Sequence, residues 1–284
     1  MNKNSNKYIF NTIKKHKISS ILIAISGGQD SIYLTDLIKN LKSQCNINQI
    51  EYIYVDHQWK IDSVKQIEHI INYLKPSKNN LNIYQIKKII LSENLSRIYR
   101  YHTIINHAIK YKYSIILTGH SQTDKLETFL LNLTRGTSLE GATSLTLHRK
   151  LNYNIHIIRP IINSNRSNIN WYCRKFSLPN WSDTTNNYYT MQRNRVRYEL
   201  MPYLRKYFNI NIEKNLNIFL KTCFNDNEYI KQNTIKLYLN IRHNRYIAIN
   251  LSYTNQQHIS IKYRILQLFF YHNFCILLNN NMLI

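Results

Sequence analysis

The stretch of the chain with the clearest chemistry is SGGQDS, from Ser26 to Ser31, between an apolar run and an apolar-periodic run. Two adjacent glycines let backbone N–H groups turn toward an anion, and the two serines add hydroxyl donors. A helix that starts here would add its N-terminal dipole. We expect this loop to bind phosphate, although a plain tight turn with Asp30 as a helix cap is the alternative. The Walker pattern GK[ST] and the dinucleotide pattern GxGxxG are both missing. A phosphate loop with Asp30 in place of the Walker lysine indicates binding of pyrophosphate, with Asp30 near a metal ion.

Glycine is rare in this chain, and its positions are informative. Asn, Ile, Lys and Tyr dominate the composition, which is typical of AT-rich codons, and such drift removes glycine where it is dispensable. The five glycines of the 284 residues fall in three short stretches of the first half: Gly27, Gly28, Gly119, Gly136 and Gly141. They therefore indicate positions that need a positive φ or a close approach.

Two further polar stretches follow predicted strands. Asp56 and His57 end an apolar run, where they are either ordinary caps or part of a nucleotide pocket. The stretch LTGHSQTDKLET places His120, Asp124 and Glu127 on one helix face, because residues three and four apart are neighbours. A solvated acidic face is the usual explanation. Acids are scarce here, however, with 15 Asp+Glu against 38 Lys+Arg, so we predict a site for a cation.

A fourth stretch, QRNRVRYELMP, offers possible phosphate contacts at Arg193, Asn194, Arg195 and Arg197. A charged helix start is the alternative interpretation. The net charge of +23 favours a polyanionic partner, and interleaved aromatic side chains could stack on unpaired bases. We therefore expect nucleic acid rather than a membrane surface as the partner, and no apolar stretch reaches the 18 residues of a membrane span.

The elements that must position these residues alternate along the first half of the chain. Nearly continuous apolar runs predict buried strands at 21–25, 50–55, 81–86 and 114–118, with a weaker strand at 155–158. Helices are predicted at 30–42, 62–74, 93–111, 123–133, 165–176 and 195–207, and later around 213–238 and 258–272. This alternation predicts an α/β fold, a parallel twisted sheet with helices on both faces. Ligands of such sheets lie beyond the carboxyl ends of the strands, where SGGQDS falls.

These stretches together resemble the tRNA(Ile)-lysidine synthetase family, which belongs to the N-type ATP pyrophosphatase (PP-loop) superfamily. SGGQDS is similar to the superfamily signature SGGxDS, SRIYRY to the family's ARxxRY, and GHSQTDKLET to its GHxxDDxxET. TRGTSLEGA, the segment from IIRPIIN to SDTTN, and QRNRVRYELMPYL resemble later family motifs. The matches run in order from about Ile21 to Leu204. Thr123 replaces the usual first of two acids, and Ser138 replaces a glycine.

The resemblance implies an adenine nucleotide alpha hydrolase-like fold and an ATP-dependent ligase. ATP would adenylate the 2-carbonyl oxygen of the wobble cytidine in tRNA(Ile) with anticodon CAU, releasing pyrophosphate. The ε-amine of free L-lysine would then attack that carbon and release AMP, giving lysidine and changing the codon read from AUG to AUA. Because the ε-amine has a pKa of about 10.4, a carboxylate or His120 should take its proton.

The resemblance also assigns residues to roles. ATP would be bound by Ser26, Gly27, Gly28, Gln29, Asp30, Ser31, Asp56 and His57, with Asp30 as the Mg²⁺ ligand. The catalytic set would be Asp30, Arg97, His120, Asp124 and Glu127. Within that set, the carboxylates of Asp124 and Glu127 would pair with the lysine substrate. The tRNA would be bound by Arg100, Arg135, Arg193, Asn194, Arg195 and Arg197, and Arg97 and Arg100 could also stack on a flipped cytosine.

Two other classes of protein stay open. A tRNA thiolase of the same superfamily usually needs cysteines near its site. Here they are scattered without CxxC spacing, which favours free thiols in a reducing compartment: Cys45, Cys173, Cys223 and Cys275. An amidotransferase would need a glutaminase domain, for which there is no room. A non-catalytic basic RNA-binding protein is disfavoured by the intact Asp30, Asp124 and Glu127.

The organisation and location of the protein follow from the same observations. We predict a catalytic PP-loop domain over 1–208 and a short, mainly helical, tRNA-contacting region over 209–284. The basic N-terminal stretch is expected to be mature sequence rather than a targeting leader. AT-driven composition favours the plastid stroma of an organelle-encoded protein over a bacterial cytoplasm, and a homodimer is possible.

Overall fold

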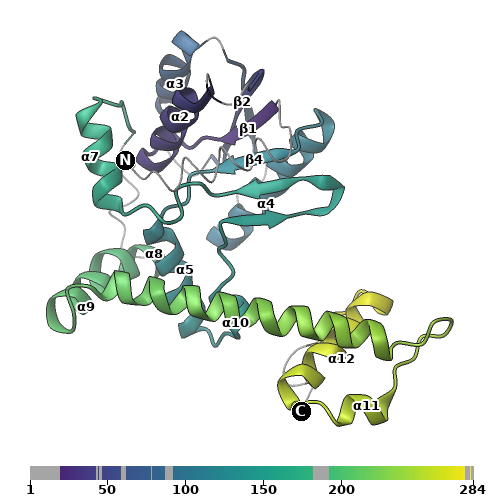
Figure 1. Cartoon of the computed structure of the whole chain (residues 1–284). Helices are drawn as coiled ribbons and strands as arrows, with labels where there is room; N and C mark the ends of the chain where they lie inside the picture. Colours follow the sequence, from purple (N-terminus) through teal and green to yellow (C-terminus); the bar gives the residue numbers. More distant parts are fainter. Residues whose placement is uncertain are drawn as a thin grey trace. The chain divides into compact units, whose positions relative to one another are not determined.

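The computed structural model of the chain describes residues 20–42, 44, 47–58, 62–77, 79–86, 92–181, 192–278 and 282. The chain separates into two compact units (Figure 1). Unit 1 comprises Met1–Arg135 and Ser144–Ile210, and unit 2 comprises Gly136–Thr143 and Asn211–Ile284. The short segment Gly136–Thr143 therefore joins the C-terminal unit, which the sequence pattern did not indicate. The functional roles of the two parts stay predictions.

Unit 1 is built on one six-stranded sheet with the order β3-β2-β1-β4-β6-β5. Its strands are β1 (Ser20–Ala24), β2 (Gln49–Asp56), β3 (Leu81–Gln85), β4 (Ile115–Thr118), β5 (His148–Lys150) and β6 (His156–Ile158). The strands pair in parallel, except that β5 pairs with β6 in the antiparallel direction. The predicted parallel sheet is confirmed. Strand β5 was not predicted, because its sequence HRK contains no apolar residue.

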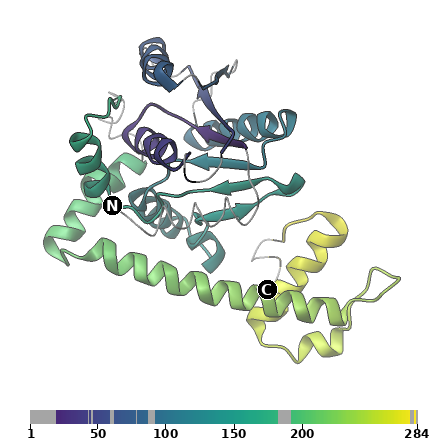
Figure 2. The ribbon, with the colours of Figure 1, turned by 45° about the horizontal axis from the view of Figure 1, so that its top comes forward.

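Helices cover both faces of this sheet (Figure 1 and Figure 2). The helices of unit 1 are α2 (Gln29–Lys42), α3 (Ser63–Leu74), α4 (Glu93–Lys110), α5 (Gln122–Thr134), α7 (Arg166–Lys175), α8 (Gln192–Arg195), η4 (Val196–Leu200) and α9 (Met201–Tyr207), of which α8 and η4 pack on α5. Alternate residues of β1 point to opposite faces. Ile21 and Ile23 pack into a core shared with α2, α3 and α7, whereas Leu22 packs with Ile104 of α4.

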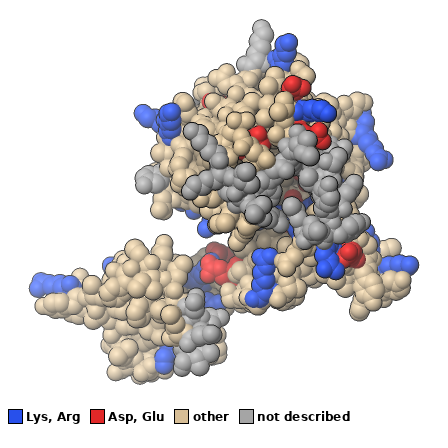
Figure 3. Space-filling view, turned by 180° about the vertical axis from the view of Figure 1, so that it is seen from behind, with Lys and Arg blue, Asp and Glu red and all other residues tan. Residues whose placement is uncertain are grey.

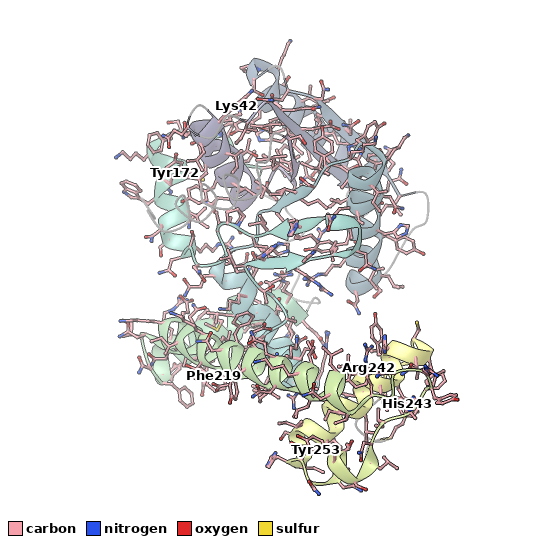
Figure 4. All side chains as sticks on the ribbon, turned by 45° about the vertical axis from the view of Figure 1, so that its right-hand side comes forward. Lys42, Tyr172, Phe219, Arg242, His243 and Tyr253 are labelled. Carbon is pink, nitrogen blue, oxygen red and sulfur yellow. The ribbon has the colours of Figure 1, made fainter. Side chains whose placement is uncertain are left out.

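Polar contacts join the helices that flank the sheet. The Tyr172 hydroxyl of α7 donates a hydrogen bond of 2.7 Å to Asp36 Oδ2 of α2, and Tyr172 is labelled in Figure 4. Burial and the Asp36 charge raise the pKa of Tyr172, so the phenol stays protonated and keeps donating. This bond fixes α7 beside the helix that follows the SGGQDS loop.

The helix predicted at 195–207 is confirmed, and it contains a π-helical turn. It consists of α8, the five-residue π-helix η4 and α9, and Pro202 lies in the first turn of α9. Proline has no backbone N–H to donate to the preceding turn, and π-helical turns locally widen a helix. Arg197 lies within this π-helical turn.

Unit 2 is helical: α6 (Leu139–Ala142), α10 (Ile212–Ile241), α11 (Leu251–Asn255) and α12 (Ile259–Phe274). Tyr238, Ile241 and Ile265 form its small buried core between α10 and α12. The predicted helices at 213–238 and 258–272 are confirmed, and α11 was not predicted. Among the described residues, no helix has the length and apolar character to cross a membrane.

Candidate active site

The SGGQDS loop is fixed by its own residues. Gly27 has φ +73°, in the left-handed region, and a Cβ there would lie 3.2 Å from the Ile70 side chain. The Ser31 hydroxyl donates to the Gly28 carbonyl at 2.8 Å, and the Ser26 hydroxyl donates to Ser31 Oγ at 3.2 Å. The loop runs directly into the N-terminus of α2, whose backbone N–H groups and dipole favour an anion. The geometry suits a phosphate group.

Gly119 brings the end of β4 against this loop. A Cβ at Gly119 would lie 3.0 Å from Ser31 Cα and 3.1 Å from its backbone nitrogen. The obstacle is backbone rather than a flexible side chain, so the approach requires glycine. This contact places His120 and the start of α5 beside the phosphate loop.

The predicted cation site on α5 is occupied by two arginines of the chain itself. Arg193 donates from Nη2 to Asp124 Oδ1 and from Nε to Glu127 Oε2, both at 2.7 Å. Arg197 donates from Nε to Glu127 Oε1 at 2.5 Å and from Nη2 to Glu127 Oε2 at 3.0 Å. The backbone N–H and hydroxyl of Ser121 donate to Asp124 Oδ2 at 2.8 and 3.0 Å. We call Asp124, Glu127, Arg193 and Arg197 the carboxylate–arginine cluster.

The cluster balances two negative charges with two positive ones in a buried place. Glu127 is fully buried, and the Arg193 and Arg197 side chains are 24% and 17% exposed. Buried charges need such pairing, because desolvation of an unpaired ion is costly. An ammonium ion therefore meets carboxylates that already have partners, and it can bind them only by adding to or exchanging guanidinium contacts.

The four residues predicted to contact phosphate do not form one row. Arg193 and Arg197 face the carboxylates, Asn194 is buried, and Arg195 pairs with Glu199 at 3.0 Å on the surface. Lys and Arg are dispersed over the face shown in Figure 3 rather than gathered at one place. A tRNA role for these four residues stays a prediction.

The electrostatics of this edge depend on burial and on nearby charges. Burial, and then the Asp124 charge, raise the pKa of Asp30 to about 6, against the opposing charges of Arg166 and Arg197. Burial lowers the pKa of His120 to about 3, and the Asp124 charge opposes this shift. Burial would raise the pKa of Asp124, but the arginine charges and the Ser121 hydrogen bonds lower it on balance. At neutral pH His120 is therefore uncharged and Asp124 is ionised.

The positive charges of three arginines act on His120. Arg97 and Arg100 of α4 and Arg159, which follows β6, all lower its pKa through their charges. Arg159 is buried, donates from Nη1 to the Thr146 carbonyl at 2.9 Å, and has no hydrogen-bond partner for Nε among the described residues. Arg159 lies in the segment from IIRPIIN to SDTTN and was not predicted as a site residue. Its position after a strand, before Pro160, was the available signal.

The remaining predicted residues lie at the ends of a strand and of a helix. Asp56 ends β2 and accepts a hydrogen bond of 2.9 Å from the Gln58 backbone N–H, which is an ordinary turn contact. His57 follows it directly. Arg135 ends α5, where its Nη2 donates to Gln192 Oε1 at 2.9 Å. The structure thus groups Asp30, His120 and the carboxylate–arginine cluster, and places Arg135 elsewhere on unit 1.

The donor set around Asp30 fits a magnesium site completed by substrate. Mg²⁺ prefers oxygen ligands and is commonly held by one or two carboxylates together with phosphate oxygens and waters. Asp30 offers a carboxylate, and Ser26 and Ser31 offer hydroxyl oxygens. The described residues contain no group of three or more His, Cys, Asp or Glu that could hold a metal alone. Nucleotide phosphates would have to supply the other ligands.

Comparison with known proteins identifies the family. Residues 1–204 match the PP-loop domain family. The chain is 52% identical over 265 residues to "tRNA(Ile)-lysidine synthase, chloroplastic" of Gracilaria tenuistipitata var. liui, and the match covers 93% of this chain and 83% of that protein. The chain belongs to the tRNA(Ile)-lysidine synthase family. A chloroplastic tRNA(Ile)-lysidine synthase of Pyropia yezoensis is 35% identical, over 96% of this chain and 84% of its own length.

A solved structure supports the fold of this tRNA(Ile)-lysidine synthase family member. The U34-tRNA thiolase NcsA from Methanococcus maripaludis, described with its [4Fe-4S] cluster, matches with a TM-score of 0.61 at 14% identity. The match covers 76% of this chain and 78% of that one. In the present chain, Cys173 and Cys223 are buried free thiols, and Cys173 is held in an apolar core. The described cysteines therefore do not form a cluster-binding group.

Proposed function

We propose that this protein ligates free L-lysine to C2 of the wobble cytidine of tRNA(Ile) with anticodon CAU, using ATP and giving lysidine. Lysidine pairs with A, so the tRNA reads AUA. The observation that carries the proposal is the position of the carboxylate–arginine cluster directly beside the SGGQDS loop. A site for a charged amino acid and a site for nucleotide phosphates meet at one edge of the sheet, in a chain of the tRNA(Ile)-lysidine synthase family.

In the first step the O2 atom of cytidine attacks the α-phosphorus of ATP. An O–P bond forms, and the bond to pyrophosphate breaks. This step is needed because a carbonyl oxygen is a poor leaving group, whereas a phosphate ester leaves as AMP. The Ser26 and Ser31 hydroxyls and the loop backbone bind the departing pyrophosphate. Mg²⁺ held at Asp30 would supply neutralisation of the phosphate charge.

In the second step the ε-amine of lysine attacks C2, and the C2–O bond to AMP breaks. Asp124 and Glu127 bind lysine by exchanging guanidinium contacts for ammonium contacts. Deprotonation of an amine with a pKa of about 10.4 costs roughly 4–5 kcal/mol at pH 7. Because the cluster has no net charge, it stabilises the ammonium form less than two bare carboxylates would.

The attacking amine must lose a proton, and both Asp124 and His120 accept it weakly, because the pKa of each is lowered. Burial lowers the pKa of His120 to about 3, so its imidazole holds a proton poorly. Its Nδ1 lies 3.0 Å from Thr118 Oγ1, which fixes the ring beside the loop. We assign His120 to orienting substrate through hydrogen bonds, together with the three arginines whose charges act on it.

We also propose that the protein acts in the plastid stroma. Relatives from Gracilaria tenuistipitata var. liui, Pyropia yezoensis and Cyanidium caldarium carry names ending in "chloroplastic". The Asn-, Ile-, Lys- and Tyr-rich composition is typical of AT-rich genomes and supports the same location.

The test of the proposed function separates its two steps. Pyrophosphate release from ATP is measured with tRNA(Ile) of anticodon CAU, first without and then with labelled lysine. We expect pyrophosphate release to depend on the tRNA. Labelled lysine should enter the tRNA only when ATP is present. A tRNA with U at the wobble position is the matched control and should support neither step. Release without any incorporation of lysine would contradict the proposal.

A further inference from the structure

Unit 2 contains a pocket of about 230 Å³ that the active site does not use. It lies between the end of α10, the turn that leads to α11, and α12. Arg242 and His243 are labelled at the end of α10 in Figure 4. The walls are formed by residues 242–248 together with Tyr238, Phe269, His272 and Asn273.

Backbone hydrogen bonds hold the turn that forms this pocket. Arg242 and Ile249 form an antiparallel bridge, and the His243 N–H donates to the Ala248 carbonyl at 2.9 Å. On the α12 side, the Tyr238 hydroxyl and His272 Nδ1 are 2.8 Å apart. The pocket is therefore preformed, and a ligand would lose little affinity to ordering of the protein.

The polar groups of the pocket favour an anion. The backbone N–H groups of Arg245 and Tyr246 donate to His243 Nδ1 at 3.1 and 3.0 Å. In a neutral imidazole the proton is then on Nε2, where it can be donated to a ligand. Arg242 and Arg245 are exposed, and neither forms an ion pair within the described part of the chain. No Asp or Glu lines the pocket.

An exposed aromatic side chain stands beside these cations. Tyr246 is 74% exposed, and its ring centroid lies 4.9 Å from that of His243. Exposed rings next to arginines are the usual means of binding unpaired bases, because every base has a face that can stack. The volume is below the roughly 300–1,000 Å³ of pockets that enclose a whole small molecule, so it suits part of a longer chain.

We propose that this pocket binds one unpaired nucleotide of the tRNA substrate. A phosphate contacts Arg242, Arg245 and the Nε2–H of His243, and the base stacks on Tyr246. The identity of the RNA rests on the proposed function, whereas the chemistry of the ligand rests on the pocket alone.

Binding of tRNA is measured without ATP or lysine, using Arg245→Ala and Tyr246→Ala. Lys236→Ala and Tyr229→Ala are the matched controls, because both side chains are exposed on α10 outside the pocket. We expect Tyr246→Ala to weaken tRNA binding by about tenfold. Arg245→Ala should weaken it and reduce the slope of log affinity against log salt by about 1. The controls should bind within about twofold of the parent protein, and Tyr246→Phe should retain affinity because it keeps the ring.

A second measurement does not depend on loss of binding. In Tyr246→Trp, the new indole should be quenched when tRNA is added, and free ATP should not quench it. Equal tRNA affinity of the pocket variants and their controls would overturn the proposal, as would quenching by ATP but not by tRNA. Failure of the proposed function is distinguishable, because the parent protein would then bind tRNA through the pocket without incorporating lysine.

Discussion

Replacement of Glu127 by Gln should destabilise unit 1 far more than the same replacement on its surface. Glu127 is fully buried and accepts three hydrogen bonds of 2.5–3.0 Å from Arg193 and Arg197. Gln keeps the size of the side chain but removes its charge, and its amide N–H₂ faces donors. The two guanidiniums then retain only Asp124 as a counter-charge. Removal of one partner from a buried ion pair costs about 3–5 kcal/mol.

The expected change is large enough to measure by thermal or urea unfolding. For a unit of about 200 residues, 1 kcal/mol corresponds to about 2–4 °C in Tm, so Glu127→Gln should lower Tm by about 6–20 °C. Glu199→Gln is the matched control. Glu199 pairs with Arg195 at 3.0 Å, but the two side chains are 49% and 64% exposed. An exposed pair contributes about 0.2–1 kcal/mol, so Tm should fall by no more than about 4 °C.

Both variants change the net charge by one, so general electrostatic repulsion cannot explain a difference between them. Unfolding of Glu127→Gln at the same temperature and urea concentration as Glu199→Gln would refute the reasoning. The guanidiniums would then be stabilised by solvent, and the carboxylates would be available to lysine without exchange.

Three further outcomes follow from the site. Asp124→Asn should reduce lysine transfer at least tenfold, since a charge-assisted hydrogen bond contributes about 1.5–3 kcal/mol. The tRNA-dependent release of pyrophosphate should persist. Equal loss of both steps would place Asp124 in the nucleotide site. Gly119→Ala should raise the ATP concentration needed for half-maximal pyrophosphate release, because its Cβ would lie 3.0 Å from the Ser31 backbone, and an unchanged ATP dependence would contradict that contact. The folded-state pKa of His120, about 3, lies below its ordinary 6.5, so the unfolded chain takes up the proton first and stability falls as pH drops below 6.5. His120 should contribute a loss of about 2 kcal/mol by pH 5, measured in urea unfolding as the difference between the parent protein and His120→Asn, and the exposed control His102→Asn should lose as much stability as the parent protein.

Local sequence patterns predicted the positions of five of the six strands and of the turn between β1 and α2. Apolar runs such as Ile21–Ile25 are short and nearly continuous, as expected for strands that are buried on both faces of a parallel sheet. The rare glycines were equally informative. Gly27 has a positive φ, and Gly119 lies too close to the Ser31 backbone for a side chain. These requirements are local, and they are therefore visible in the residues themselves.

The partners of the carboxylates could not be predicted in the same way. Arg193 and Arg197 lie 66 to 73 residues from Asp124 and Glu127 along the chain. The two arginines are spaced to lie on one helix face, and so are the two carboxylates. This spacing was visible in the sequence, but it does not specify that the two faces contact each other. The π-helical turn at Val196–Leu200, which contains Arg197, also has no signature in the sequence periodicity.

The central claim is that lysine becomes bonded to C2 of the wobble cytidine. After incubation with ATP, lysine and tRNA(Ile) of anticodon CAU, the tRNA is digested to nucleosides and the wobble position is analysed by mass spectrometry. The account predicts a cytidine heavier by one lysine less one water, with one AMP and one pyrophosphate formed for each modified tRNA. An unmodified cytidine, or one in which sulfur has replaced oxygen, would contradict it.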